Sequence, residues 1–255
     1  MSLKQPHVEL RDVRLSYGDF LIQQDLSFSI GRGEVFVIMG GSGCGKTTVL
    51  RSIIGLKAPA AGQVLINDTD IWTLPEAERD RLKRNTGVLF QQGALWSSMT
   101  LAENIALPLQ LYTDLDSTDI ADVCELKLAL VGLSGFGAYY PNEISGGMRK
   151  RAGLARAMAL DPDILCFDEP SAGLDPLSSK RLDDLILELR DSLGTTVIVV
   201  THELASIFDI ADHSVFLDPE TKTQLATGKP ATLRDECDNL KVRQFLARGE
   251  VAQDA

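Results

Sequence analysis

The sequence predicts an α/β fold with a parallel sheet at its core, an N-terminal antiparallel β subdomain and an inserted helical subdomain. Two observations carry this prediction. Residues 35–39 and 164–167 are short, uninterrupted apolar runs, as expected for strands buried on both faces of a parallel sheet. Stretches of helical periodicity follow both runs. Such alternation of strands and helices is typical of a parallel α/β core with ligand sites at the carboxyl ends of its strands.

The first elements can be placed in order. Apolar and polar residues alternate at 8–17 and again at 26–30, which indicates half-buried strands of an antiparallel sheet. The buried strand at 35–39 leads directly into a glycine-rich loop. Apolar residues at positions 49, 50, 53 and 54 then follow at helical spacing, so the order strand, loop, helix is predicted here.

The middle of the chain has a different character. Residues 94–140 are expected to be mostly helical, with Ser117 as the cap of a helix that continues through Ile120, Val123 and Leu126. We predict that this insertion forms a helical subdomain spanning approximately residues 94–158.

The last third of the chain returns to the α/β pattern. Residues 177–193 have helical periodicity that ends at Gly194, and residues 195–200 form a β-branched run typical of another buried strand. The tail, approximately residues 229–255, is polar and weakly helical. Residues 1–255 are predicted to form a single domain.

The composition limits the possible partners. A chain of 255 residues with 44% hydrophobic content can bury one sizeable core, alone or with a small appended subdomain. The formal net charge of -11 argues against nucleic acid or an anionic lipid surface as the main partner, because those surfaces need clustered Lys and Arg. The one short basic run, residues 149–151, is expected to make local contacts instead.

Cysteine spacing and hydropathy indicate the compartment. The four cysteines, at positions 44, 124, 166 and 237, show no CxxC spacing, so neither a zinc site nor a disulfide framework is predicted. Residues 1–6 lack the apolar run of a signal peptide, and no stretch approaches the roughly 18 apolar residues of a membrane span. We therefore expect a soluble, cytosolic protein that works at a membrane only by docking onto another chain.

Residues 40–47, Gly-Gly-Ser-Gly-Cys-Gly-Lys-Thr, match the phosphate-binding pattern G-x-x-x-x-G-K-[ST]. The glycines allow successive backbone N–H groups to surround a phosphate, and the following helix adds its partial positive charge. Lys46 can reach the β- and γ-phosphates, the Thr47 hydroxyl can bind Mg²⁺, and Thr48 can donate to the α-phosphate. A flexible glycine turn is the alternative, but the strand before the loop and the helix after it are the context that the motif requires. The predicted nucleotide-binding residues here are Gly40, Gly41, Ser42, Gly43, Cys44 (through its backbone), Gly45, Lys46, Thr47 and Thr48.

A second strand end carries two acids. The apolar run 164–167 ends in Asp168 and Glu169, which are followed by a proline. Beside the phosphate strand, Asp168 would hold Mg²⁺, and Glu169 would accept a proton from the attacking water as a general base. Strands often end in acids before a turn, so this interpretation depends on the phosphate loop upstream.

Residues 144–148, Ile-Ser-Gly-Gly-Met, precede that strand. Ser145 can cap a helix running to Ala159, and Gly146 and Gly147 would expose its first N–H groups to an anion. In this context the motif resembles the LSGGQ signature of ABC ATPases, with Ile144 in place of Leu and Met148 in place of Gln.

Other positions then match landmarks of that family. Tyr17 resembles the aromatic residue that stacks on adenine, and Gln91 resembles the Q-loop glutamine that senses Mg²⁺ and water. Residues 171–175, ending in Asp175, resemble the D-loop that crosses to a partner subunit, with one extra glycine. His202 resembles the H-loop histidine that contacts the γ-phosphate, whereas His7 and His213 have no assigned task. Lys46, Glu169 and His202 are the predicted catalytic residues, and Ser145, Gly146, Gly147, Met148 and Asp175 are predicted to bind nucleotide.

The resemblance covers residues 8–228 and implies a P-loop NTPase core of the RecA-like type that binds ATP and Mg²⁺. In this family ATP lies between the phosphate loop of one subunit and the signature of a second copy. A membrane permease would dock on the helical subdomain near residues 91–107, and a small accessory subunit and a lipid-binding component are further possible partners. The resemblance places the chain on the cytoplasmic face of the inner membrane.

Three stretches, residues 88–95, 144–157 and 167–176, look like the ATPase subunit of Mla/Mce-type phospholipid transporters. Importers or exporters of other substrates remain the alternative. A P-loop kinase would not need the signature, and non-transport ABC proteins usually show paired cassettes, a coiled-coil insertion or a basic face. A non-hydrolysing regulatory module would be expected to lack Glu169 or His202.

Overall fold

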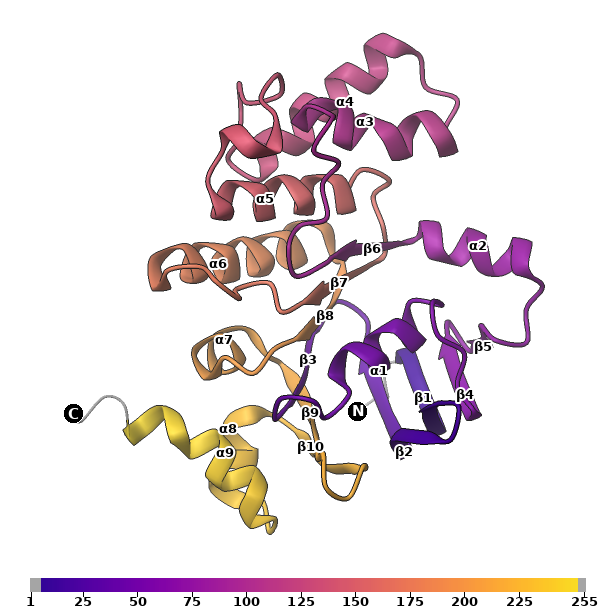
Figure 1. Cartoon of the computed structure of the whole chain (residues 1–255), viewed down its shortest axis with the longest axis vertical. Helices are drawn as coiled ribbons and strands as arrows, with labels where there is room; N and C mark the ends of the chain where they lie inside the picture. The colour runs from indigo at the N-terminus through magenta and orange to yellow at the C-terminus, as the bar shows by residue number, and fades with distance from the viewer. Residues whose placement is uncertain (1–5, 252–255) are drawn as a thin grey trace.

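The computed structural model describes residues 6–251 of the chain. A six-stranded sheet and a four-stranded sheet form its centre (Figure 1). The predicted α/β fold with an antiparallel N-terminal sheet is confirmed. Residues 1–5 and 252–255, which hold most of the N-terminal segment and the end of the tail considered above, lie outside the described residues.

The six-stranded sheet has the order β10-β9-β3-β8-β7-β6, and its neighbours pair in parallel except for β9 and β10. Residues of β3 alternate between two apolar clusters: Val35, Val37 and Met39 belong to one, whereas Phe36 and Ile38 belong to the other. Both faces of the sheet are therefore covered, which explains why β3 has no polar position. The strands are β3 (Val35–Gly40), β6 (Thr86–Leu89), β7 (Ile164–Asp168), β8 (Thr196–Val200), β9 (His213–Leu217) and β10 (Gln224–Gly228).

The four-stranded antiparallel sheet has the order β2-β1-β4-β5. Helix α1 (Lys46–Ile53) contacts strands of both sheets, and its residues Val49, Leu50 and Ile53 are buried between them. The phosphate loop is thereby fixed between the two sheets. The strands are β1 (Pro6–Tyr17), β2 (Phe20–Gly31), β4 (Ala61–Ile66) and β5 (Thr69–Asp70).

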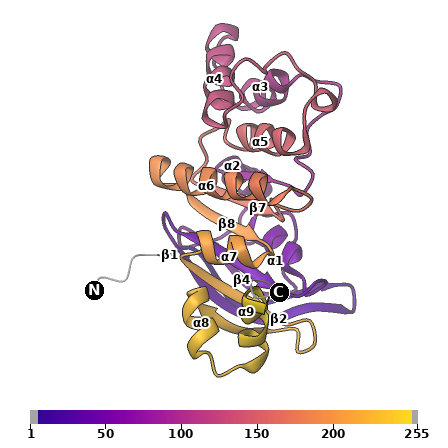
Figure 2. The same cartoon turned by 90° about the vertical axis from the view of Figure 1, so that its left-hand side faces the viewer.

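Helices α3 (Leu101–Tyr112), α4 (Ser117–Leu130) and α5 (Gly146–Ala157) lie together at one end of the molecule (Figures 1 and 2). The prediction that Ser117 caps α4 is wrong. Asp116 is the cap, because its carboxylate accepts hydrogen bonds from the N–H groups of Thr118 and Asp119, and Ser117 is the first helical residue. A one-turn 3₁₀ helix, Pro141–Glu143, precedes α5.

Helix α5 is capped as predicted, since the Ser145 hydroxyl accepts a hydrogen bond from the Met148 N–H at 3.2 Å. The helix ends at Ala157, two residues before the predicted Ala159. Helix α6 (Pro176–Leu193) ends where predicted, because Gly194 adopts a left-handed conformation with φ of 67°.

The tail contains two helices, in keeping with its weakly helical pattern. Helices α8 (Pro230–Glu236) and α9 (Leu240–Val251) lie at the end of the molecule opposite α3 and α4 (Figure 2). Leu233, Val242 and Leu246 are buried in the main apolar cluster. The few apolar residues of this polar segment are spaced to face the core, so the tail is part of the fold.

The sequence patterns did not predict the elements within residues 61–84 or 204–228. These regions contain β4, β5, β9 and β10, together with helices α2 (Glu76–Arg84) and α7 (Leu204–Ile210). The thiols of Cys44, Cys124, Cys166 and Cys237 are free. Within residues 6–251, no helix combines the length and the apolar character that crossing a membrane requires.

Candidate functional site

Four parallel strands carry the predicted site residues at their carboxyl ends. The phosphate loop follows β3, Glu169 follows β7, His202 lies two residues after β8, and Gln91 lies two residues after β6. Parallel strands end at the same edge of a sheet, so the fold brings together residues that are far apart in the sequence.

Two glycines of the phosphate loop have conformations and surroundings that exclude other residues. Gly40 has φ of 148°, and a Cβ there would lie 2.3 Å from the Leu217 carbonyl oxygen. Gly45 has φ of 93°, and its Cβ would lie 2.5 Å from Ile22 Cγ2. Any side chain at position 40 or 45 would therefore clash with the residues packed around the loop.

Lys46 lies inside this loop with only 7% of its surface exposed. Its ammonium donates to the carbonyl oxygens of Gly40 at 2.9 Å and Gly41 at 3.2 Å. The same nitrogen lies 3.9 Å from Glu169 Oε1. The cation is thus held between the loop and the acidic strand end.

Two further contacts join the strand ends. The Thr47 hydroxyl donates to Asp168 Oδ1 at 2.8 Å, and His202 Nδ1 lies 2.9 Å from Glu169 Oε1. Glu169 has φ of 50°, a left-handed conformation that is uncommon for a non-glycine residue. Its second carboxylate oxygen, Oε2, is buried and has no hydrogen-bond partner among the described residues. A strained, partly unsatisfied carboxylate facing a phosphate loop is typical of a reacting group.

A pocket of about 490 Å³ opens between these elements. It includes most of the predicted phosphate-loop residues together with Gln91, Glu169 and His202. It also includes Ile22, which was not predicted from the sequence. An isoleucine within a strand is usually a core residue, so nothing in the sequence marks Ile22 as part of a binding site. The lining residues are Ile22, Ser42, Gly43, Gly45, Lys46, Thr47, Thr48, Gln91, Glu169 and His202.

Tyr17 and Cys44 do not line this pocket. Tyr17 is 47% exposed at the end of β1, and the Lys57 ammonium lies 4.9 Å from its ring centroid. The Cys44 side chain is buried in the core, and burial raises the pKa of its thiol, partly opposed by Lys46. The Cys44 carbonyl accepts a hydrogen bond from Gln23 Nε2 at 2.7 Å, which ties the loop to β2.

The signature residues lie outside the pocket as well. Ser145 and Gly146 are exposed, and Gly147 and Met148 are partly exposed, at the amino end of α5. Asp175 instead caps α6, where it accepts hydrogen bonds from the Ser178 N–H and hydroxyl; these contacts, the hydroxyl first, lower the pKa of the carboxyl group. Within one chain, the phosphate loop and the signature therefore do not form one cavity.

The basic run at 149–151 makes local contacts, as predicted. Arg149 donates to the Ile144 carbonyl oxygen at 3.2 Å and Arg151 to the Val131 carbonyl oxygen at 2.8 Å. Lys150 is buried and donates to two carbonyl oxygens of the segment after Glu169. The two remaining histidines lie away from the phosphate loop: His7 Nδ1 contacts the Thr196 hydroxyl, and His213 Nδ1 contacts Glu34.

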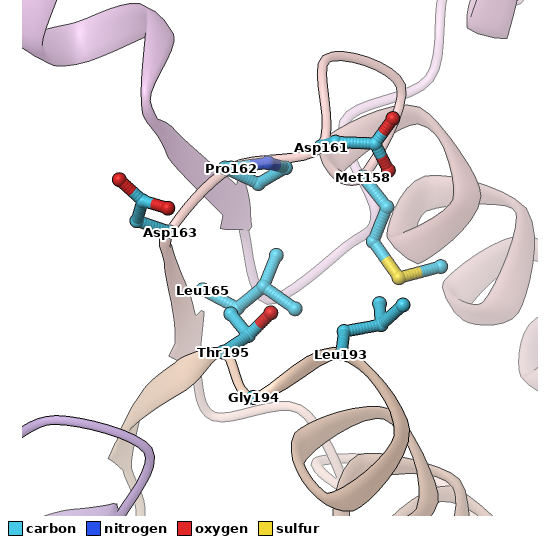
Figure 3. A pocket seen from close by; sticks show the side chains of 8 residues that line it. All are labelled: Met158, Asp161, Pro162, Asp163, Leu165, Leu193, Gly194 and Thr195. Atoms are coloured by element: carbon cyan, nitrogen blue, oxygen red, sulfur yellow. The ribbon is translucent and has the colours of Figure 1, made fainter.

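A second cavity, of about 150 Å³, lies at the opposite edge of the sheet (Figure 3). Asp163 and Thr195 line it just before β7 and β8 begin, whereas the candidate site lies where those strands end. Its volume is below the roughly 300 Å³ at which ligand sites usually begin. It is therefore not a competing nucleotide site.

The fold and the site define a P-loop nucleoside triphosphatase. A buried strand, a glycine loop and a helix present a lysine and a threonine to a phosphate. Strand β7 supplies an aspartate against that threonine and a glutamate against that lysine, although it does not lie directly beside β3 as predicted, because β8 lies between the two strands.

Comparisons with known proteins narrow this class. Residues 23–172 match the family profile described as "ABC transporter". "Intermembrane phospholipid transport system ATP-binding protein MlaF" of Escherichia coli K12 is 40% identical over 239 residues, covering 94% of this chain and 88% of that protein. "Probable ribonucleotide transport ATP-binding protein mkl" of Mycobacterium tuberculosis H37Rv is 41% identical over 94% of this chain. The alignment spans 66% of the length of that relative, slightly less than two thirds.

Two solved structures of ABC proteins are similar to this chain, in agreement with the family profile. The dimeric ATP-binding cassette MJ0796 bound to ADP and Pi is 29% identical, with a TM-score of 0.79, and the match covers 87% of this chain and 98% of that one. The cbiO1 protein of Clostridium perfringens, at 23% identity and a TM-score of 0.83 over 98% of this chain and 99% of that one, supports the fold alone. The chain belongs to the ABC transporter family, which confirms the predicted family.

Proposed function

We propose that this chain binds and hydrolyses ATP to drive an ABC transporter that moves phospholipid. The observation that carries the proposal of hydrolysis is the cluster at the strand ends, where Glu169 contacts both His202 and Lys46 beside the phosphate loop. Hydrolysis needs a base, a phosphate anchor and a group that orients the base, and this cluster supplies all three.

Each residue has a separate proposed task. Glu169 accepts the proton of the attacking water, and His202 holds the carboxylate through its Nδ1 contact. Lys46 neutralises the negative charge that spreads over the transferred phosphoryl group. The backbone N–H groups of Ser42 to Thr48 surround the phosphates, and Tyr17 is proposed to stack on adenine.

The oxygen donors present fit Mg²⁺. The Thr47 hydroxyl and the Asp168 carboxylate already meet at 2.8 Å beside the loop, and Mg²⁺ prefers carboxylate and hydroxyl oxygens together with substrate phosphates. We propose that Thr47, Asp168 and Gln91 hold it. When bound, the ion neutralises phosphate charge and helps to orient the nucleotide.

A second copy of the chain is the proposed partner in the site. Ser145 and Gly146 are exposed at the start of α5, and their helix end is suited to bind an anion that the same chain does not present to them. The dimeric state of the MJ0796 cassette supports this pairing. Ser145, Gly146, Gly147 and Met148 would then complete the site of the opposite subunit, and Asp175 would lie beside the crossing D-loop.

A groove of about 500 Å³ between α2, α3 and α5 is the proposed contact for a membrane permease. Trp96 and Leu111 line it and are 59% and 62% exposed, and Tyr112 is 49% exposed. Large apolar side chains in a groove mark a protein contact. The groove overlaps the predicted docking region, residues 91–107, and it would hold the chain peripherally at the inner membrane. A small accessory subunit and a lipid-binding component are further proposed partners.

The proposed cargo depends on the relatives. MlaF is named for intermembrane phospholipid transport, whereas mkl is named for ribonucleotide transport, so transport of another substrate is the alternative. Purification of the chain with its membrane subunits, followed by mass spectrometry, should find bound phospholipid. Absence of any bound phospholipid would contradict the assignment.

Glu169→Gln tests the proposed base. The amide keeps the size of the side chain but cannot take a proton, so ATP binding should persist while turnover falls at least about a hundredfold. Isothermal titration would give the affinity, and phosphate release would give the turnover. A variant with wild-type turnover would remove Glu169 as the base.

A further inference from the structure

Lys150 is a buried cation for which the proposed mechanism has no role. It lies in the second turn of α5 and is 6% exposed. Its ammonium donates to the carbonyl oxygens of Pro170 at 2.5 Å and Ala172 at 2.6 Å. Burying an ammonium group is costly, and burial lowers the pKa of Lys150, although the carboxylates of Glu203 and Glu169 act in the opposite direction. Charge-assisted hydrogen bonds are strong enough to fix the segment that accepts them.

The segment that accepts these bonds follows the candidate base. Pro170 is the residue after Glu169, and the Ala172 N–H donates back to the Glu169 carbonyl oxygen at 3.2 Å. Glu169 itself has φ of 50°. A left-handed backbone at a non-glycine residue persists only when its surroundings hold it, and the two bonds from Lys150 are part of those surroundings.

The other end of the connection is the signature. Helix α5 starts at Gly146, so Lys150 lies one turn from the residues proposed to face the second copy. Its neighbour Arg151 also donates to two carbonyl oxygens, those of Val131 at 2.8 Å and Gly132 at 3.2 Å, but these belong to the loop after α4. Lys150 thus links the signature helix to the catalytic strand end, whereas Arg151 links it to the helical subdomain.

We propose that Lys150 is a positioning residue for hydrolysis, which transmits the position of the signature helix to the backbone that follows Glu169. When α5 contacts the nucleotide bound to the second copy, Lys150 moves together with α5 and repositions the segment from Pro170 to Ala172. The movement of that segment in turn positions the Glu169 carboxylate. This inference rests on the proposed roles of Glu169 and of the signature.

The test is Lys150→Met, with Arg151→Met as the matched control. Methionine keeps an unbranched apolar stem and removes the donor. Because a misplaced reacting group costs up to about a hundredfold in rate, Lys150→Met should lower kcat by about tenfold to a hundredfold. KM for Mg-ATP should stay near the wild-type value, since the phosphate loop is untouched. Arg151→Met should lose thermal stability without this selective loss of kcat.

The measurements are kcat and KM from phosphate release, with thermal midpoints, on the purified chain at one protein concentration. Equal kcat in Lys150→Met and Arg151→Met would overturn the proposal. If either methionine variant fails to fold, Lys150→Gln and Arg151→Gln replace the pair: a slower Lys150→Gln supports the role, and equal kcat overturns it. Glu169→Gln, assayed in parallel, distinguishes failure of the proposed role of Lys150 from failure of the proposed base. Full turnover in Glu169→Gln would overturn the assignment of Glu169 as the base.

Discussion

The phosphate-loop half of the site and the signature half differ in how much of their geometry one chain completes. Around the phosphate loop, Lys46 is buried, Thr47 is bonded to Asp168, and Glu169 contacts His202. At the signature, Ser145 is exposed and its hydroxyl is used within its own helix, as the acceptor of the Met148 N–H. The phosphate loop is held by contacts within one chain, whereas the signature presents an exposed helix end. This contrast supports the proposal that one chain holds two unlike halves of a site.

The largest expected effect is a loss of ATP turnover, caused by a substitution that disables the signature and leaves the phosphate loop intact. Gly147→Asp adds a side chain where a Cβ meets only ordinary contacts, the nearest at 3.7 Å, and a negative charge in the first turn of a helix. That charge suits the chain's own helix but repels a phosphate presented by a second copy. The variant should fold and bind ATP, while its turnover falls by about a hundredfold or more.

Mixing this variant with Lys46→Ala sharpens the comparison. Lys46→Ala should bind nucleotide weakly, but its signature is intact. In a random mixture, half of the dimers pair one of each, and each of these has one intact site, so about a quarter of wild-type turnover should return. Phosphate release measured before and after mixing is the readout. No recovery would contradict the shared site, and full activity of Gly147→Asp alone would remove the signature from it.

Substitution of glycines in the phosphate loop is expected to have a smaller effect, which is a loss of affinity for ATP. Gly45→Ala places a Cβ against Ile22 at φ of 93°, whereas Gly43→Ala imposes φ of 77° with no atom within 4 Å. A left-handed alanine costs about 1–2 kcal/mol, so Gly43→Ala should weaken ATP binding by about tenfold, and Gly45→Ala by more.

Gly135→Ala is the control for these loop variants. Gly135 has φ of 80° in open space, outside the loop, so its substitution should lower stability without changing ATP affinity. Equal affinities for all three variants, measured by titration, would show that the loop is not held as described.

The smallest expected effect on ATP binding and turnover lies behind the site, between α6 and α7, where the change is one of stability. Asp183 is buried, and burial raises the pKa of its carboxyl from 3.8 to about 6, although the hydrogen bond from Ser206 opposes this. Between pH 3.8 and about pH 6 the folded protein binds more protons than the unfolded chain, so the free energy of unfolding falls as pH rises through this window.

Asp183→Asn removes this pH dependence. One pKa unit corresponds to about 1.4 kcal/mol. The free energy of unfolding of the variant, relative to that of the wild type, should therefore rise by about 2–3 kcal/mol when the pH is raised from 4 to 7.5. Urea unfolding of both proteins at the two pH values checks it, and turnover should change little. A stability difference that is the same at both pH values would contradict the raised pKa.

The functional motifs could be predicted because each needs particular residue types at a fixed spacing. The loop from Gly40 to Thr47 and the acids after β7 follow from local chemistry, and strand ends on one sheet must meet. The N-cap at Ser145 is equally local. Ser117 was assigned wrongly because Asp116, one residue earlier, is an equally good acceptor, and sequence alone does not decide between adjacent caps.

Other features depend on residues that meet only in three dimensions. Ile22 lines the pocket because β2 passes the glycine at position 45, and nothing in its own neighbourhood marks it. The tail helices are held by three buried apolar residues within a polar segment, too few to produce a clear periodic signal. Lys150 appears in the sequence as one member of a basic run, although its two neighbours bind different parts of the chain.

The sequence by itself determined the parallel α/β core, the phosphate loop, the acidic strand end and the signature, because these depend on short-range pattern and backbone chemistry. Only the tertiary structure decided that the phosphate loop and the signature lie apart within one chain, that Glu169 is left-handed, and that Lys150 links the two halves. The physical reason is distance along the chain: hydrogen bonds and burial between remote segments depend on how strands and helices pack, and no local pattern records them.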